Sequence, residues 1–279
     1  MTEKNGIVTF ECDKDSKDKE ILNSTQRNNG IVFPDPKTYP NAQYIVNWKN
    51  TCNCTSYAMM LEYSGAMFPP GKYSQPEDNL CYFILTDNRI LEDYKKSQPV
   101  LYNAWMKTFT GTATKQDLEN AYPPNELHAY LSKGANLWLG YEATAFNTNV
   151  NFKKALWHYM VEDNLPMAIS TNFGGAGHIV CVTGVQYKKA DYEALNFAKL
   201  SKSKNFDELI NTVNPVAIIV DDPWGNASST NFEKYPTGGG GSGNDIVVPW
   251  DIVVKKVKPL NSPVKKWCHY INKRGMATV

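Results

Sequence analysis

The spacing of apolar positions changes about half-way along the chain. In the first half they recur at intervals of three and four, which predicts helices. The helical stretches are "RILEDYKKS", "TKQDLENAY", "NELHAYLSKG" and "NFKKALWHYMVED", which begin at residues 89, 114, 125 and 151. The second half carries short Val- and Ile-rich runs separated by Gly, Pro and Asn, which predicts strands. These runs are "PMAIS", "HIVCVTGVQY", "NPVAIIVDDPWG" and "DIVVPWDIVVKKVK". Helices followed by strands indicate an α+β domain with an antiparallel sheet.

The segment "NWKNTCNCTSYAMMLEYSG" (47–65) predicts a further helix ahead of these elements. Its apolar positions recur at three and four, and Ser64-Gly65 ends it. Those apolar positions are Cys54, Tyr57, Ala58 and Leu61. Cys52 therefore lies where this helix begins.

The pattern divides the chain into an N-terminal arm and one domain. Residues 1–40 are polar and end in the proline-rich "FPDPKTYP", so we expect an arm laid over a domain that spans 41–279. Within the domain, residues 188–213 predict a helical insertion between two strands. Residues 236–245, "PTGGGGSGND", predict a mobile loop, and the segment 255–279 is locally basic.

Composition limits the classes of function. The chain has 279 residues, of which 42% are hydrophobic, enough for a full core. The 29 Lys and Arg residues nearly balance 28 Asp and Glu, so no global field predicts a nucleic-acid partner. The chain contains no run of about 18 apolar residues, so we expect no membrane insertion. Its N-terminus lacks the basic region followed by an apolar one that a signal peptide has, so we expect cytoplasmic synthesis.

The six cysteines are scattered and include no CxxC pair, which predicts neither a disulfide scaffold nor a zinc site. The chain has no HExxH or GxSxG motif, and its glycine run lacks the GK[ST] of a phosphate loop. Metalloprotease, serine hydrolase and nucleotide-binding functions are therefore disfavoured. We expect no metal and no cofactor.

Cys52 is the candidate nucleophile. A nucleophilic thiol must ionise readily, and the free N–H groups and dipole of a helix N-terminus favour the thiolate. Cys54 shares a helix face with Ala58 and Leu61, so we expect it to lie inert in the core. The alternative is that both cysteines are core residues.

His178 is the candidate base, because it joins a glycine-rich turn to an alternating strand in "FGGAGHIVCVTGV". His128 and His158 lie inside helical patterns and His269 lies in the basic tail, so structural roles are expected for these three. A base of this kind needs a partner to hold its tautomer. The strand end Asp221-Asp222-Pro223 offers Asp222, with Asp221 as the alternative, since strand alternation puts only one of them on the His178 face.

The order of these residues resembles a known family. His178 follows Cys52 by 126 residues, and Asp222 follows His178 by 44. Together with "CNCTSYAM", "GH" before a Val-rich strand and "DPWG" at a strand end, this order resembles the papain-like cysteine peptidases of the C39-like group. That group includes bacteriocin-leader peptidases and phage cell-wall endopeptidases, and Asn53 after the cysteine is most similar to the phage, endolysin-like type.

The resemblance implies a papain-like fold, with the nucleophile at a helix N-terminus packed on an antiparallel sheet. It also implies a Cys52-His178-Asp222 triad and an oxyanion-hole donor upstream of the cysteine, for which Gln43 is the candidate and Asn47 the alternative. The implied substrate is a peptide, in peptidoglycan for the phage type, and the enzyme would act at the cell wall or in a virion. Two alternatives stay open: a leader-type peptidase, and an inactive papain-like binding module.

Overall fold

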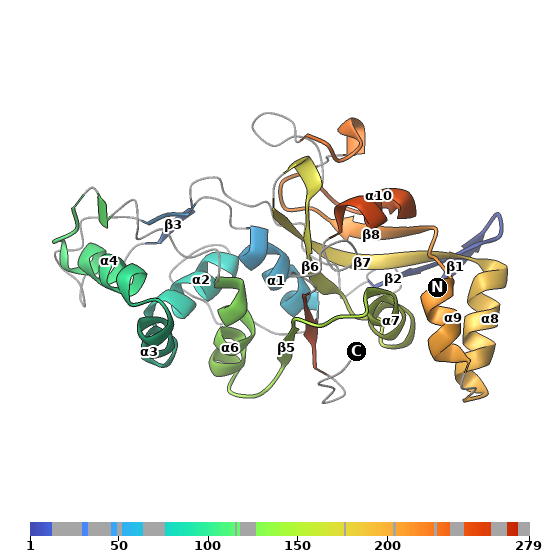
Figure 1. Cartoon of the computed structure of the whole chain (residues 1–279), viewed down its shortest axis with the longest axis horizontal. Coiled ribbons are helices and arrows are strands. Elements are labelled where there is room, and N and C mark those ends of the chain that lie inside the picture. Colours follow the sequence, from blue (N-terminus) through green and yellow to red (C-terminus); the bar gives the residue numbers. More distant parts are fainter. Residues whose placement is uncertain are drawn as a thin grey trace.

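The computed structural model describes residues 1–12, 30–32, 46–48, 52–63, 76–114, 116–117, 127–175, 177–202, 205–225, 228–234, 243–257 and 267–272. Its fold is α+β, as the sequence predicts, with a group of helices beside an antiparallel sheet (Figure 1).

Within the described residues the larger sheet has eight strands, each antiparallel to its neighbours. They are β1 (Thr2–Lys4), β2 (Ile7–Glu11), β5 (Thr144–Asn147), β6 (Met167–Thr171), β7 (His178–Lys188), β8 (Ala217–Asp221), β9 (Ile246–Pro249) and β10 (Cys268–Ile271). The main path runs β1-β2-β7-β6-β10-β5, and β8 pairs with β7 and β9. A separate pair joins β3 (Gly30–Val32) to β4 (Val46–Trp48).

Strand β7 is the centre of this sheet. It pairs with β6 through residues 178–182, with β2 through 184–188, and with β8 through 181–186. The residues from His178 to Val185 are all buried. Gly184 permits the close approach of β2, because a Cβ there would lie 2.6 Å from the Phe10 carbonyl oxygen.

Five of the described helices lie before β5 in sequence, ahead of most strands of the larger sheet. They are α1 (Cys52–Tyr63), α2 (Pro76–Thr86), α3 (Asn88–Ser97), α4 (Pro99–Thr110) and α6 (Leu127–Leu139). The short α7 (Phe152–Ala155) continues into a π-helical turn (Leu156–Glu162), and α8 (Lys189–Leu200), α9 (Phe206–Thr212) and α10 (Trp250–Lys256) lie between later strands. Single 3₁₀ turns occur at Phe173–Gly175 and Ser228–Thr230.

Helix α1 joins the two halves of the molecule. It packs on β6, β7 and β10 of the sheet and on α2 and α6 of the helical group (Figure 1). All of its residues except Asn53 and Glu62 are buried, as expected for a helix enclosed on every side. The position of Cys52 is therefore fixed by both halves.

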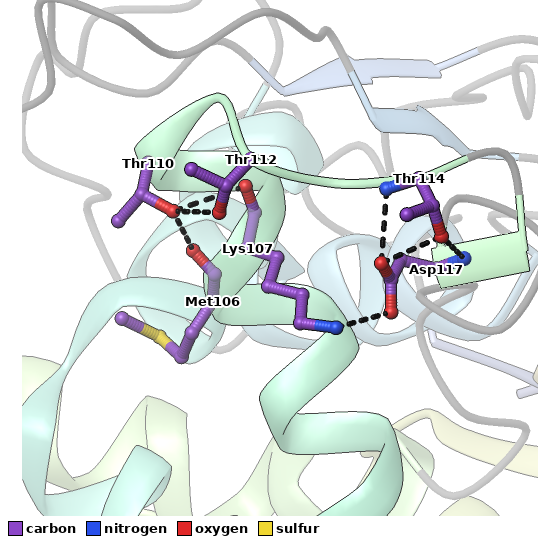
Figure 2. A network of polar contacts seen from close by, with 6 residues as sticks. All are labelled: Met106, Lys107, Thr110, Thr112, Thr114 and Asp117. Carbon is purple, nitrogen blue, oxygen red and sulfur yellow. Dashed lines mark hydrogen bonds and ion pairs between the residues drawn. The ribbon is translucent and has the colours of Figure 1, made fainter.

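A polar network lies at the start of the predicted helical segment "TKQDLENAY" (Figure 2). Within the described part of this segment, Gln116 and Asp117 are helical. The Thr114 N–H donates to Asp117 Oδ2 at 2.9 Å, and the Asp117 N–H donates to Thr114 Oγ1 at 3.1 Å. This reciprocal pair is a capping box. The Thr114 N–H and the Lys107 ammonium, which lies 2.9 Å from Asp117 Oδ1, lower the pKa of Asp117 to about 2.

The structure corrects two expectations and adds a strand to the basic segment. Residues 7–11 of the predicted arm form β2, an integral strand whose Val8 and Phe10 are buried. The second half of "DIVVPWDIVVKKVK" forms α10, because Pro249 precedes the helix and Asp251 and Lys255 complement its dipole at the two ends. Part of the predicted basic tail forms β10, which pairs on both edges. Most of the predicted mobile loop, 236–242, lies outside the described residues.

The two helices of the predicted insertion, α8 and α9, are packed against the core. The Trp157 ring of the π-helical turn contacts Tyr187 of β7, Tyr192 of α8 and Phe206 of α9 at centroid distances of 6.0, 5.9 and 5.8 Å. Phe206 is buried, whereas Phe197 of α8 is 75% exposed. The insertion is therefore anchored by two aromatic residues, Tyr192 and Phe206, while Phe197 faces solvent.

Phe206→Ala should lower the free energy of unfolding by about 3–5 kcal/mol, because it leaves a cavity beside Trp157. Phe197→Ala is the matched control and should change it by no more than about 0.5 kcal/mol. Urea denaturation of both variants measures the difference. Equal losses would show that the insertion does not depend on the Phe206 contact.

Candidate active site

Cys52 is the first residue of α1 and lies apart from the main core. It is 7% exposed and shares a small apolar cluster with Ala168, Ile179 and Trp267. Cys54 is fully buried within the main core, as the helical pattern predicts. The helix N-terminus supplies the positive dipole end at Cys52, and the geometry thus separates a site cysteine from a core cysteine.

His178 is the first residue of β7 and follows a glycine-containing turn. Gly174 and Gly175 of that turn have φ values of 69° and 78°, in the left-handed region that favours glycine. The His178 side chain is 6% exposed. Thr171 lies opposite His178 on the neighbouring strand β6. Its hydroxyl donates to the His178 carbonyl oxygen at 3.1 Å, which holds the backbone of His178 in place.

Asp222 follows the last residue of β8 and meets the imidazole. Its Oδ1 accepts from His178 Nε2 at 2.7 Å and from the Trp224 N–H at 2.9 Å. Asp221 is engaged elsewhere, since its Oδ1 accepts from the Asp245 N–H at 3.0 Å. Of the two aspartates that the strand end offers, the structure brings Asp222 to His178.

The imidazole interacts with both of its predicted partners. Burial alone lowers the pKa of His178, but the charges and hydrogen bonds of Asp222 and Cys52 outweigh burial and raise it to about 10. Because Nε2 binds Asp222, Nδ1 is the ring nitrogen left for the thiol. Thiol, imidazole and carboxylate thus form one connected series.

Ser56 ties the nucleophile helix to the histidine strand. It lies one turn after Cys52 and donates its hydroxyl to the Ile179 carbonyl oxygen at 3.0 Å. Ile179 directly follows His178, so this bond fixes the N-terminal turn of α1 against the start of β7. The sequence places Ser56 on the helix but does not show its partner, which is 123 residues away.

Strand β10 and the residue before it bring two aromatic residues to the site, both from the segment predicted to be a basic tail. Trp267 packs beside Cys52, and its ring centroid lies 5.6 Å from that of Phe146 on β5. His269 is buried, with Nδ1 3.2 Å from Ser132 Oγ and its ring 4.6 Å from Phe146. Trp267 and Phe146 therefore form an apolar wall next to the thiol, and His269 packs against both of their rings.

The other predicted residues lie outside this arrangement or outside the described chain. His158 Nδ1 lies 2.8 Å from Glu162 Oε2 on the π-helical turn, which agrees with the structural role expected for this histidine. Gln43 is outside the described residues, and only the backbone of Asn47 is described, in β4. The upstream oxyanion-hole donor therefore stays a prediction. Among the described residues, no group of three His, Cys, Asp or Glu side chains could hold a metal ion.

Comparison with protein families agrees with this geometry. The model of the Peptidase_C39 like family matches residues 36–242, a range that includes Cys52, His178 and Asp222. The chain belongs to the Peptidase_C39 like family. No curated protein and no solved structure gave a significant match.

Membership of the Peptidase_C39 like family supports a cysteine peptidase and implies a peptide substrate. The papain-like arrangement is present, with the candidate nucleophile at a helix N-terminus and the candidate base on the sheet. In the part of the chain that the structure describes, no helix is both long and apolar enough to cross a membrane.

The raised pKa of His178 predicts how stability depends on pH. An unfolded histidine loses its proton near pH 6.5, but folded His178 keeps it to about pH 10. This contribution to stability is therefore fully present below pH 6.5 and lost as the pH rises through about 10. The free energy of unfolding should fall over this window in the wild type, and Asp222→Asn should flatten the curve. Urea denaturation from pH 6 to 10 measures the free energy of unfolding of both proteins. If it depended on pH equally in the wild type and in Asp222→Asn, the pairing of His178 with Asp222 would not be the cause of the raised pKa.

Proposed function

We propose that this chain is a cysteine endopeptidase that uses Cys52, His178 and Asp222 to cleave peptide bonds in bacterial cell-wall peptidoglycan, as a phage lysis or tail-associated enzyme. The observation that carries the peptidase chemistry is the imidazole of His178, which interacts with Cys52 and is held by Asp222 at 2.7 Å. The three groups come from α1, β7 and the end of β8, so only the folded chain assembles them.

In the proposed reaction His178 already carries the proton taken from Cys52, in line with its raised pKa, and Sγ attacks the peptide carbonyl carbon. The Cys52 N–H and Gln43 stabilise the negative oxygen of the tetrahedral intermediate, each donor contributing about 10²–10³ in rate. His178 then gives its proton to the leaving amine. In the second half, His178 deprotonates a water that hydrolyses the thioester and frees Cys52. Asp222 holds the imidazole in the tautomer and orientation that both halves need.

The cell-wall assignment rests on the Cys52-Asn53 pair, which resembles the phage-type members of the group. The basic segment adds little to it. Lys256, one of the described lysines of that segment, is 12% exposed and paired with Glu233 at 2.7 Å. An ammonium group already paired in this way is a weak contact for an anionic polymer.

Purified peptidoglycan tests the proposal when incubated with the wild type, Cys52→Ala and Cys54→Ala. Cys54→Ala removes a thiol from the core but leaves the site intact, so it controls for loss of fold. We expect new free amino groups from the wild type and Cys54→Ala, and none from Cys52→Ala. Mass spectrometry of the fragments would identify the bond.

Three results would contradict the proposal. Equal release by the wild type and Cys52→Ala would show that Cys52 is not the nucleophile. No release by folded wild type, with cleavage of a Gly-Gly leader peptide, would replace the wall substrate with a protein precursor. No cleavage of either substrate would indicate an inactive binding module.

A further inference from the structure

The connection from β8 to β9 begins at Asp222 and is closed at its base. The Asp222 N–H donates to the Gly243 carbonyl oxygen at 2.8 Å, and the Asp245 N–H donates to Asp221 Oδ1 at 3.0 Å. The strand pairing Val220 to Ile246 follows directly. Residues near the end of this connection thus contact both aspartates at its start.

Gly243 lies closer to Asp222 than any other residue type allows. A Cβ on Gly243 would lie 1.9 Å from the Asp222 carbonyl oxygen and 2.9 Å from its carbonyl carbon. Ordinary contact between such atoms is about 3.5 Å, so a side chain would force these two backbones apart by more than 1 Å. The backbone position of Asp222 therefore depends on glycine at 243.

The same connection also contacts the turn that leads to His178. The Phe232 carbonyl oxygen accepts from the Gly174 N–H at 2.9 Å, and its ring centroid lies 4.8 Å from that of Phe173. Phe232 is 3% exposed and has a φ of 61°, a left-handed conformation that is costly for a bulky residue. Such strain persists only where surrounding contacts fix it, and it concentrates at functional sites.

We propose that residues 228–234 and 243–245 act as a clasp that holds His178 and Asp222 in register, with Gly243 as a positioning residue for Asp222 and Phe232 for the turn before His178. This inference rests on the proposed triad. Gly243 contacts the backbone of Asp222, and Phe232 contacts the backbone of Gly174 in the turn that leads to His178. Asp222 and His178 are the two partners of the 2.7 Å hydrogen bond. Displacing it would lengthen that bond without changing any of the three reacting side chains.

The test compares Gly243→Ala with Gly184→Ala. Both variants introduce a Cβ that would clash with a backbone carbonyl oxygen. The clash at Gly243 is with Asp222, next to the site, and the clash at Gly184 is with Phe10, within the sheet. The readouts are the rate at which iodoacetamide alkylates Cys52 at pH 6, located by mass spectrometry, its pH profile, and kcat on any substrate found. Gly243→Ala should lower the rate and kcat by about 10²-fold, as expected for a displacement of about 1 Å. Gly184→Ala should lose stability but keep the wild-type rate.

Phe232→Leu provides a second variant should Gly243→Ala not fold. It keeps the carbonyl oxygen but removes the ring contact with Phe173, and it should slow alkylation of Cys52 by about tenfold. Wild-type reactivity in folded Gly243→Ala, or in Phe232→Leu, would overturn the clasp. Equal slowing by Gly184→Ala would also overturn it, because any loosening of the sheet would then suffice. If Cys52 of the wild type reacts no faster than Cys54, the proposed triad itself fails.

Discussion

The hydrogen bond between His178 Nε2 and Asp222 Oδ1 joins two side chains that are almost completely buried. Removing both from water costs free energy, and their attraction offsets that cost only while the geometry is kept. Loss of one partner of such a pair typically destabilises a protein by about 3–5 kcal/mol, because a buried charge is left uncompensated. The register of β7 against β8, with Cys181 opposite Asp221, is what places the pair at one end of the sheet.

The thiol reaches this pair because α1 is enclosed between the helical group and the sheet. Ser56 bonds to the backbone next to His178, and the small cluster with Ile179 and Trp267 fixes Cys52 on the same side. Local chemistry and global packing therefore agree at this position, since the helix N-terminus that favours a thiolate also faces the imidazole. Each contact involves residues far apart in sequence, so the site exists only in the folded chain.

Much of this arrangement could be predicted from the sequence. Cys52 at a helix start, His178 after glycines and Asp222 at a strand end each have a local signal, and the change of period predicts the α+β fold. The contributions of β2, β10 and α10 could not be predicted, because short apolar runs take their structure from the partners they meet. Ser56, Trp267 and Gly243 act through contacts with residues 123, 215 and 21 positions away, which no local pattern reports.

The charge state of His178 tests the account most directly. Nitrogen NMR of the ¹⁵N-labelled imidazole, assigned by comparison with a His178→Gln variant, reports whether both ring nitrogens carry protons at each pH. The account predicts a doubly protonated ring through neutral pH that loses a proton near pH 10, and a lower titration point in Asp222→Asn. A ring that becomes neutral near pH 6.5 in the wild type, as in an ordinary histidine, would contradict a Cys52-His178-Asp222 unit.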